Sequence, residues 1–519
     1  MTSRIGAPLS GIAAGAVTLG VAELLALALT RLDAASGTPS PLLAVGGAFV
    51  DRTPPWLKDF AVATFGTNDK LALFVGMGLT LFVACALLGV VATARYRVGL
   101  VLFAVVGVIG SGIVLTRPGS GTVDTIPTIV GTLAGLGVLS WLARGAGQAT
   151  SVAPVDGSVP SRRGVLAWGT GLTVLGAVAM YAGRTMSNAG ETVQAARQRV
   201  TDRFAGTTAA SGPPVTIPAD ADFKINGLAS YVSPNDNFYR IDTALSVPQI
   251  DPDSWSIRVH GMVDQEIEMT YEDILNEELM ETAVTLTCVS NTVGGNLIGN
   301  AVWTGWPIRE LLERAGVSGG ADMVLSTSSD GFTAGTPLEA LTDDRDAIFA
   351  VLMNGEPLPA QHGFPVRMVV PGLYGYVSAT KWVVDLKVTT FAADQGYWTP
   401  RGWSAEGPIK VQSRIDVPAS GESIDAGKGV IAGVAWDQHT GIEKVEVQVD
   451  DGEWQTAELG GSVSDDTWLQ WRLDWDAPSG DHTVMVRATN KDGETQTSEE
   501  TAVAPNGATG WHTIDVSVA

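Results

Sequence analysis

Cysteine is the scarcest residue in this chain of 519 residues, which contains only Cys85 and Cys288. Two cysteines cannot form a disulfide framework. They also stand in segments of different character, LFVACALL for Cys85 and TLTCVSNTVGG for Cys288, so we expect no bridge between them. Histidine is also scarce, and all of it follows residue 250: His260, His362, His439, His482 and His512. Residues 1–185 therefore offer no histidine ligand for a haem between membrane helices.

Positive charge, and lysine in particular, is in short supply. The chain has nine lysines and 23 arginines against 55 acidic residues, a net charge of −23 with a pI of about 4.5. This balance excludes nucleic acid as an expected partner. An acidic, lysine-poor composition suits a high-salt habitat, and a high-GC bacterium is equally compatible with it.

Long apolar runs are confined to residues 1–185. Crossing about 30 Å of hydrocarbon takes roughly 20 apolar residues. Five runs approach this length: 8–30, 71–92, 98–116, 125–143 and 164–182. Glycine and alanine in each run favour close helix packing. We therefore expect a transmembrane domain of five helices. Residues 39–66, interrupted by TPPW, are predicted to form a loop or an interfacial segment.

The arginines of this part predict its orientation. Arg4 precedes the first span, Arg95 and Arg97 lie between the second and third, and Arg144, Arg162 and Arg163 lie between the fourth and fifth. With five spans these groups share one side, which the positive-inside rule assigns to the cytoplasm. The N-terminus is then cytoplasmic, and the chain after Arg184 lies outside. Glu23, inside the first span, is expected to face protein.

The stretch SRRGVL at 161–166 has two interpretations. One is ordinary positive-inside topology. The other is a twin-arginine export signal, which precedes a moderately apolar segment and is used for domains exported in the folded state. A domain that acquires its cofactor in the cytoplasm needs such a route.

The polar part of the chain is divided by its patterns into a linker at 186–222, an α+β domain at 223–400 and a β domain at 401–519. A short helix is expected in the linker, and TTAASGPPVTIPADAD is typical of an extended spacer. In the α+β domain, alternating segments such as 255–263 and 381–391 predict strands, and 270–279 predicts a helix capped by Thr270. The last domain has short alternating strands separated by DDG, PSG and KDG turns, which predicts an immunoglobulin-like β-sandwich with its tryptophans in the core.

Cys288, at the end of the strand-like run AVTLTC, has several possible roles. A lone cysteine is most often a small buried apolar residue. A nucleophilic cysteine would need an activating neighbour, and a zinc site would need further ligands at suitable spacing. A thiolate ligand of a soft metal that is held mainly by another group is the remaining possibility.

The run TLTCVSNTVGGNLIGNAVWTGWPIRELLERAGV resembles the molybdenum-cofactor domain of the sulfite oxidase family, as do MNGEPLPAQHGFPVRMVVPGLYGYVSATKW and FYRIDTALSVPQIDPDSWSIRVHGMV. EGPIKVQSRIDVP resembles the entry to the sandwich that follows that domain. The resemblance covers residues 225–519. It implies a molybdenum–molybdopterin cofactor, a small-molecule substrate, a separate electron-transfer partner (a cytochrome or a quinone-linked protein) and a possible homodimer.

The same resemblance implies roles for individual residues. Cys288 matches the metal ligand and, with Arg240, the catalytic positions. The residues that match cofactor-binding positions are Tyr239, Arg240, Asp330, His362, Arg367, Ser378, Thr380 and Lys381. Arginine and lysine suit the cofactor's phosphate, because both form charge-assisted hydrogen bonds to it.

The chain departs from the family pattern beside the cysteine. Sulfite oxidases of animals and plants carry an arginine pair there, whereas residues 289–293 read VSNTV. Another family arginine is replaced in the region of Tyr376 and Val377, and Arg240 and Arg401 are the remaining sources of positive charge. Bacterial relatives, including reductases of protein methionine sulfoxide, are more similar in this respect.

The sequence therefore predicts a membrane-anchored oxidoreductase on the outer face of the cell membrane. It would transfer an oxygen atom, with two electrons, to or from a small sulfur compound or N-oxide. The alternative is a non-enzymatic cell-surface protein that binds a partner through its β-sandwich.

Overall fold

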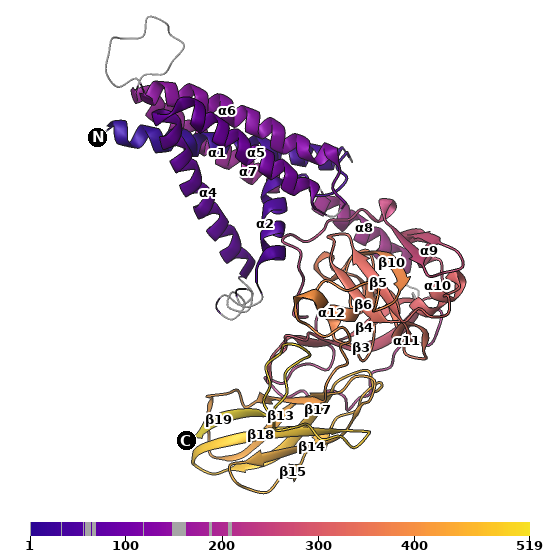
Figure 1. Ribbon diagram of the computed structural model, residues 1–519. Coiled ribbons are helices and arrows are strands. Elements are labelled where there is room, and N and C mark those ends of the chain that lie inside the picture. The colour runs from indigo at the N-terminus through magenta and orange to yellow at the C-terminus, as the bar shows by residue number, and fades with distance from the viewer. Residues whose placement is uncertain are drawn as a thin grey trace, which may run out of the picture. The chain divides into compact units, whose positions relative to one another are not determined.

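The computed structural model describes residues 2–32, 34–54, 57, 64, 69–117, 119–147, 162–185, 189–205 and 210–519. The chain forms two compact units (Figure 1). The first unit comprises Met1–Glu191 with Ala244–Ser246, and the second comprises Thr192–Thr243 with Val247–Ala519.

The first unit is helical. Its helices are α1 (Thr2–Arg31), α2 (Pro41–Arg52), α4 (Asp69–Ala94), α5 (Tyr96–Leu115), the 3-10 helix η2 (Thr122–Thr125), α6 (Ile126–Gly147) and α7 (Arg162–Thr185). Five helical stretches are long and apolar enough to cross a membrane: Ile5–Arg31, Ala72–Ala94, Tyr96–Leu115, Thr122–Arg144 and Arg163–Tyr181. The five predicted apolar helices are thus present, while their insertion and orientation in a membrane stay predictions.

Small residues allow these helices to approach closely. α1 packs against α4, α6 and α7. A side chain on Gly11 would collide with the Cys85 carbonyl of α4, and one on Gly20 would lie 2.6 Å from the Gly176 carbonyl oxygen of α7. Backbone-to-backbone packing of this kind is characteristic of helices in membranes. The prediction that Glu23 faces protein is confirmed, because its side chain is buried and accepts a 2.7 Å hydrogen bond from the Ser40 hydroxyl.

Part of the predicted loop at 39–66 is helical. Residues 41–52 form α2, with Pro41 at its first position and the Ser40 hydroxyl accepting from the Leu43 N–H at 3.2 Å. Proline at this position and a serine N-cap both favour helix initiation, which the prediction overlooked. At about 1.5 Å per residue the helix is too short to span a bilayer. The Ser161 end of the SRRGVL stretch, together with Asp33 and Asp59, lies outside the described residues.

The predicted linker contains the expected short helix, α8 (Ala189–Phe204). Its apolar side packs on the second unit through Val193, Ala196 and Val200. Arg203 donates to Glu272 at 2.7 Å and to the Leu275 carbonyl at 3.1 Å. This half of the linker is therefore attached to the second unit along its length.

The α+β part of the second unit is built on two sheets. One has the order β2-β1-β10-β5-β6, in which β1 and β10 run parallel, and the other has the order β3-β4-β7-β8, with β9 paired to β7. The strands are β1 (Ser256–Gly261), β2 (Ile267–Thr270), β3 (Met280–Thr287), β4 (Ile298–Pro307), β5 (Met323–Ser328), β6 (Thr333–Pro337), β7 (Ile348–Met353), β8 (Glu356–Pro357), β9 (Arg367–Val369) and β10 (Val383–Thr389). The two sheets share an apolar core that includes Val259, Phe349 and Leu386.

Short helices connect these strands: η3 (Pro252–Ser254), α9 (Tyr271–Leu275), α10 (Ile308–Ala315), α11 (Glu339–Thr342), η4 (Ala360–His362), α12 (Gly375–Ser378) and η5 (Thr399–Arg401). Thr270 caps α9, as predicted, because its hydroxyl accepts from the Asp273 N–H at 3.2 Å. α10 ends at Gly316, whose φ of 68° is a conformation that glycine adopts without strain.

The C-terminal part has two further sheets that share one core. Their orders are β11-β13-β17-β16 and β12-β19-β18-β14-β15. The strands are β11 (Gln412–Val417), β12 (Ser423–Ile424), β13 (Gly427–Trp436), β14 (Ile442–Val449), β15 (Gln455–Thr456), β16 (Glu458–Leu459), β17 (Leu469–Ala477), β18 (Gly480–Asn490) and β19 (His512–Val518). Ile431 and Trp471 from one sheet meet Val445 and Ile514 from the other, so the predicted tryptophan-containing core is present. Its immunoglobulin type stays a prediction.

Candidate active site

Cys288 stands where β3 ends. The Cys288 N–H donates to the Leu297 carbonyl at 2.9 Å, which closes the loop between β3 and β4 at its base. The side chain is 8% exposed. Burial raises the pKa of the thiol, while hydrogen bonds from Ser290 act in the opposite direction. The free thiol is thus protonated at neutral pH, and a soft metal that binds it would replace the proton.

Two tyrosines lie within electrostatic reach of the thiol. Burial raises the pKa of Tyr239, a negative charge on Cys288 raises it further, and Arg367 lowers it. Burial also raises the pKa of Tyr374, against a hydrogen bond from the Lys410 backbone. The pKa of Tyr239 therefore depends both on the thiol and on Arg367, one of the basic residues described next.

Four basic side chains come together from separate parts of the chain, and we call them the basic cluster: Arg240, His362, Arg367 and Lys381. Arg367 begins β9 and forms a β-bridge with Lys381. His362 ends η4, just before Gly363. At Gly363 the φ angle is 116°, and a Cβ would lie 2.8 Å from the Arg367 Cβ and 3.3 Å from the Lys381 Cβ. The glycine thus permits close approach of the other members.

A single carboxylate serves two members of the basic cluster. The Lys381 Nζ donates to Asp242 Oδ2 at 2.8 Å, and the Arg240 Nε donates to the same oxygen at 2.9 Å. The Asp242 side chain is only 3% exposed, whereas that of Arg240 is 36% exposed. Asp242 was missed by sequence reasoning, although its position two residues after Arg240 in FYRID was a usable signal.

Arg367 has no acidic partner among the described residues. Its guanidinium makes only long hydrogen bonds to carbonyl oxygens, 3.3 Å to Met368, 3.3 Å to His362 and 3.5 Å to Ala379. It also lies over the Trp303 ring, with 5.0 Å to the ring centre. A guanidinium that is 5% exposed and has neutral partners is rare in proteins without a bound anion.

The pKa values of the basic cluster reflect burial and mutual repulsion. Burial lowers the pKa of Arg367 to about 10 and that of Lys381 to about 8, although Asp242 supports the charged lysine. His362, which lies 3.2 Å from the Asn235 carbonyl through Nε2, has its pKa lowered to about 3 by burial and by Arg367 and Lys381. The histidine is therefore neutral, and three cations face one carboxylate.

This donor set fits the cofactor that the resemblance implies. A surplus of buried positive charge suits a phosphate, and arginine binds phosphate with two parallel donors. The amide Nδ2 of Asn291, three residues after Cys288, is a buried donor without a hydrogen-bond partner. A soft thiol ligand, a basic cluster and an unused amide are what a metal bound to an anionic organic group requires.

The other predicted cofactor residues lie differently. The Ser378 hydroxyl donates to the Tyr374 carbonyl at 3.0 Å, and the Thr380 hydroxyl is 2.7 Å from that of Ser326. Both hydroxyls are fully buried and already bonded within the protein. Asp330 accepts from the Phe332 N–H at 3.1 Å. The roles of these three residues toward the cofactor stay predictions.

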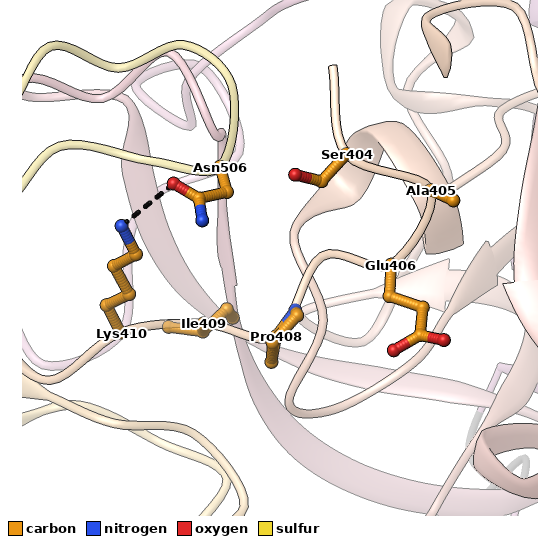
Figure 2. A pocket seen from close by; sticks show the side chains of 7 residues that line it. All are labelled: Ser404, Ala405, Glu406, Pro408, Ile409, Lys410 and Asn506. Atoms are coloured by element: carbon orange, nitrogen blue, oxygen red, sulfur yellow. Dashed lines mark hydrogen bonds between the residues drawn. The ribbon is translucent and has the colours of Figure 1, made fainter.

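A cavity of about 450 Å³ lies near Tyr374 (Figure 2). Its lining residues are Ser404, Ala405, Glu406, Pro408, Ile409, Lys410 and Asn506. Ile409 belongs to the same apolar cluster as Tyr374 and Val289, the residue that follows Cys288. The Lys410 Nζ donates to Asn506 Oδ1 at 3.1 Å and to the Gly507 carbonyl at 2.7 Å. The cavity wall thus shares an apolar cluster with the immediate neighbour of the cysteine.

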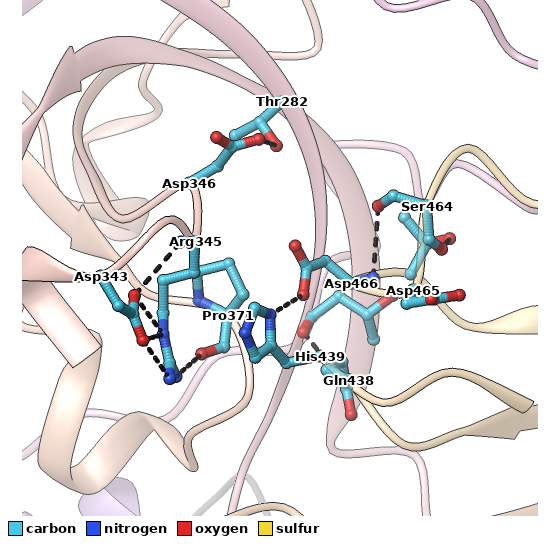
Figure 3. Close-up of polar contacts among 12 residues, drawn as sticks. Thr282, Asp343, Arg345, Asp346, Pro371, Gln438, His439, Ser464, Asp465 and Asp466 are labelled. Carbon is cyan, nitrogen blue, oxygen red and sulfur yellow. Dashed lines mark hydrogen bonds and ion pairs between the residues drawn. The ribbon is translucent and has the colours of Figure 1, made fainter. Parts of the chain in front are cut away.

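Acidic residues and a histidine also gather where the α+β part meets the C-terminal part (Figure 3). Ligand atoms of Asp343, Asp344 and His439 lie within 4.8 Å of one another. Asp343 is nevertheless bound by Arg345 at 2.7 Å, and the His439 Nδ1 lies 3.1 Å from Asp466. These contacts account for the cluster as an ion network within the second unit.

The chain is similar to known molybdenum enzymes. Residues 244–398 match the family described as "Oxidoreductase molybdopterin binding domain". Human mitochondrial sulfite oxidase (Homo sapiens) is 28% identical over 306 residues, which cover 50% of this chain and 55% of that protein. Nitrate reductase [NADH] 1 of Nicotiana tabacum is 35% identical over 178 residues, which cover 29% of this chain and 20% of that protein.

Among solved structures, the sulfane dehydrogenase SoxCD from Paracoccus pantotrophus is 23% identical with a TM-score of 0.49, over 58% of this chain and 85% of that chain. The match to human sulfite oxidase spans about half the length of that relative. The predicted resemblance is confirmed. Residues 244–398 form a molybdopterin-binding oxidoreductase domain of the sulfite oxidase family, and its cofactor is molybdenum bound to molybdopterin.

Proposed function

We propose that this chain is a membrane-anchored oxidoreductase that transfers an oxygen atom, with two electrons, to or from a small sulfur compound or N-oxide. The observation that carries the proposal is the buried guanidinium of Arg367, which among the described residues has only carbonyl oxygens as hydrogen-bond partners and is therefore suited to bind an anion. A non-enzymatic binding protein would have no use for a buried cationic surplus beside a lone thiol.

The chain's own residues would have distinct tasks. The bound molybdenum supplies the two-electron redox chemistry. Cys288 would hold the metal through Sγ, while Arg367 and Lys381 would bind the cofactor's phosphate. Arg240 is the most exposed member of the basic cluster, so its guanidinium is the one best able to reach substrate as well.

The cavity beside Tyr374 is our candidate for the substrate's approach. Its size accommodates a small molecule. Lys410 presents a positive charge there and uses two neutral oxygens as partners, whereas Glu406 contributes a negative charge at the exposed rim. The cavity therefore has no strong preference for an anion.

The surroundings of the cysteine favour a neutral substrate over sulfite. Val293 stands where sulfite-oxidising relatives have a cation and lies against Gly510 of the C-terminal part. Arg401 stacks on the Tyr397 ring, 3.7 Å from its centre. Losing one charge-assisted contact to an anion weakens binding by about 1.5–3 kcal/mol, or roughly 10- to 150-fold.

The five apolar helices support anchoring in a membrane. We propose that the second unit lies on the outer face and exchanges electrons with a separate carrier, a cytochrome or a quinone-linked protein. Nothing in the sequence before residue 250 provides a histidine for a haem of its own in the membrane part.

Metal and pterin analysis of the purified chain, followed by kinetics, tests this proposal. We expect molybdenum and molybdopterin near one per chain. We expect a larger kcat/KM for reduction of a neutral sulfoxide than for oxidation of sulfite. The two reactions are compared at matched salt, because the acidic surface repels anions. Absence of molybdenum would contradict the enzymatic proposal, and a clear preference for sulfite would contradict the neutral substrate.

A further inference from the structure

We propose that the C-terminal domain holds the molybdenum ligand in place, with Arg414 as the main positioning residue for the loop of residues 288–297, here called the cysteine loop. This role rests on Cys288 being the ligand and is independent of the substrate. It assigns to the domain a task in the chemistry of the site that a domain for subunit association would not have.

The C-terminal domain is hydrogen-bonded to the strand that leads into the cysteine loop. Gln438, after β13, is 3% exposed and donates through Nε2 to the Thr285 carbonyl at 3.0 Å and to the Thr287 hydroxyl at 2.8 Å. The backbone N–H of Trp468 donates to the Thr285 hydroxyl at 2.8 Å. Two of the last three residues of β3 before Cys288, Thr285 and Thr287, are therefore hydrogen-bonded to the C-terminal domain.

The same domain holds the far end of the cysteine loop. The Arg414 Nη1 donates to the Gly295 carbonyl at 2.8 Å, while its Nε donates to Asp416 at 2.6 Å. Arg414 is 9% exposed. A buried guanidinium fixed by a carboxylate on one side presents its remaining donors in a fixed direction, since its fork is planar.

The tip of the cysteine loop also rests on a ring of this domain. Gly294 has a φ angle of 72°, and a Cβ there would collide with the His512 imidazole. The His512 Nδ1 accepts the Ile415 N–H at 3.0 Å, which fixes the ring beside β11. Burial and the neighbouring Arg414 lower the pKa of His512, so the ring is neutral and its Nδ1 is available as an acceptor.

Contacts inside the cysteine loop transmit this support to the thiol. Asn291 Oδ1 accepts the Leu297 N–H at 2.8 Å, and the Gly295 N–H donates to the Thr292 carbonyl at 2.9 Å. The Leu297 carbonyl accepts the Cys288 N–H, and the Cys288 carbonyl accepts the Asn291 N–H. Through these two hydrogen bonds to the cysteine backbone, a displacement at Gly295 would also move Cys288. Thiolate ligands respond to such displacements, because surrounding contacts orient the ligand and tune the metal.

The test uses the full chain with three substitutions. Arg414→Met removes the contact to Gly295, Arg414→Lys keeps the charge but loses the planar fork, and Arg472→Met is the matched control. Arg472 lies in the same domain and donates to Glu458 at 2.7 Å, away from the cysteine loop. In cofactor-free protein, the rate of Cys288 alkylation is followed by peptide mass spectrometry, which separates it from Cys85.

In cofactor-loaded protein, the thiolate-to-molybdenum absorption band and the molybdenum content are recorded. We expect Arg414→Met to raise the Cys288 alkylation rate on the order of 10-fold, as for loss of one buried charge-assisted hydrogen bond. We also expect it to shift the absorption band while molybdenum content is retained. Arg414→Lys should lie between the wild type and Arg414→Met, and Arg472→Met should match the wild type.

Unchanged alkylation and an unchanged band in Arg414→Met would overturn the proposal. If that variant does not fold, Gly294→Ala replaces it, since the three atoms nearest to the added methyl group all belong to the His512 ring. Unchanged alkylation and an unchanged band in Gly294→Ala would then overturn the proposal. The metal content of a Cys288→Ala variant tests the ligand assignment separately, so a failure of that assignment is distinguishable from a failure of the positioning role.

Discussion

At the scale of single residues, Arg367 is the most informative side chain in the second unit. It is buried, positively charged and bonded only to carbonyl oxygens at 3.3–3.5 Å. The desolvation of such a group costs stability unless an anion is present. We therefore expect the cofactor-free protein to carry a destabilising site that binding of an anionic cofactor group would relieve.

Replacing Cys288 by serine should abolish turnover, because a hydroxyl is a poor ligand for a soft metal centre and does not ionise at neutral pH. The basic cluster is untouched by this change, so much of the pterin should stay bound. Activity assays and pterin fluorescence on the same sample check both statements. Full activity of the variant would remove Cys288 from its assigned role.

Cofactor retention should depend on pH through Lys381. In the cofactor-free protein the pKa of Lys381 is lowered to about 8, and burial is the largest cause. A bound phosphate favours the charged amine and raises that pKa, so binding takes up a proton at pH values above 8. Below about pH 8, Lys381 should therefore add no pH dependence to cofactor retention. Above about pH 8, the affinity for the cofactor should fall by up to about tenfold per pH unit.

Pterin retained after dialysis at several pH values from about 7 to 10 measures this effect. Any other group that titrates does so in both proteins, so the comparison with Lys381→Met isolates the lysine. Lys387→Met is the control, because Lys387 pairs with Asp394 at 2.8 Å on the surface of β10. An identical pH profile in the wild type and Lys381→Met would show that this amine does not bind the anion.

At the scale of elements, the turn between η4 and β9 brings His362, Arg367 and Lys381 together. Gly363 makes this possible, since its φ angle of 116° and its closeness to two neighbouring Cβ atoms leave no room for a side chain. Other residue types are strained at such a φ angle, and the contact with Arg367 would force the strand to move.

Gly363→Ala should lower both the melting temperature and the cofactor content. The backbone strain alone is on the order of 1–3 kcal/mol. Gly427→Ala is a matched control, because Gly427 has the same φ angle of 116° with open space around its Cβ position. Both variants bear the strain, and only the first disturbs the basic cluster. Equal cofactor content in the two would refute the packing argument.

At the scale of the whole chain, the unresolved biological question is how the second unit reaches its compartment. The arginine distribution predicts a cytoplasmic N-terminus and an outside C-terminus. Changing Arg162 and Arg163 to lysine keeps the charge, so the topology signal is preserved while a twin-arginine signal is lost. The folded second unit should then stay inside.

Protease accessibility of a C-terminal tag in spheroplasts measures this outcome. Changing Arg95 and Arg97 to lysine serves as the control, because these arginines also lie between two spans but are separated by Tyr96 and so do not form a twin-arginine pair. A tag that remains accessible in the Arg162 and Arg163 variant would refute export by the folded-protein route and leave the predicted orientation intact.

The sequence by itself determined the local and strongly patterned features. Five apolar runs predicted five apolar helices within a few residues, because span length and composition are local properties. Alternation at 255–263 and 381–391 predicted the strands β1 and β10, and Thr270 marked a helix start. The helix α2 was not predicted, because segment 39–66 was interpreted from the interrupting TPPW as a loop or an interfacial segment and the N-cap residue Ser40 was not considered.

Only the tertiary structure decided which distant residues share a site. Lys381 meets Asp242 across 139 positions of sequence, and Arg414 meets Gly295 across 119. Neither pair has a sequence signature of its own, because each pairing follows from the packing of segments that lie far apart in the chain. Burial changes what these side chains can do. The same lysine or arginine on the surface would be an ordinary solvated charge, whereas the buried Lys381 is placed for the proposed anion site and the buried Arg414 for the proposed support of the cysteine loop.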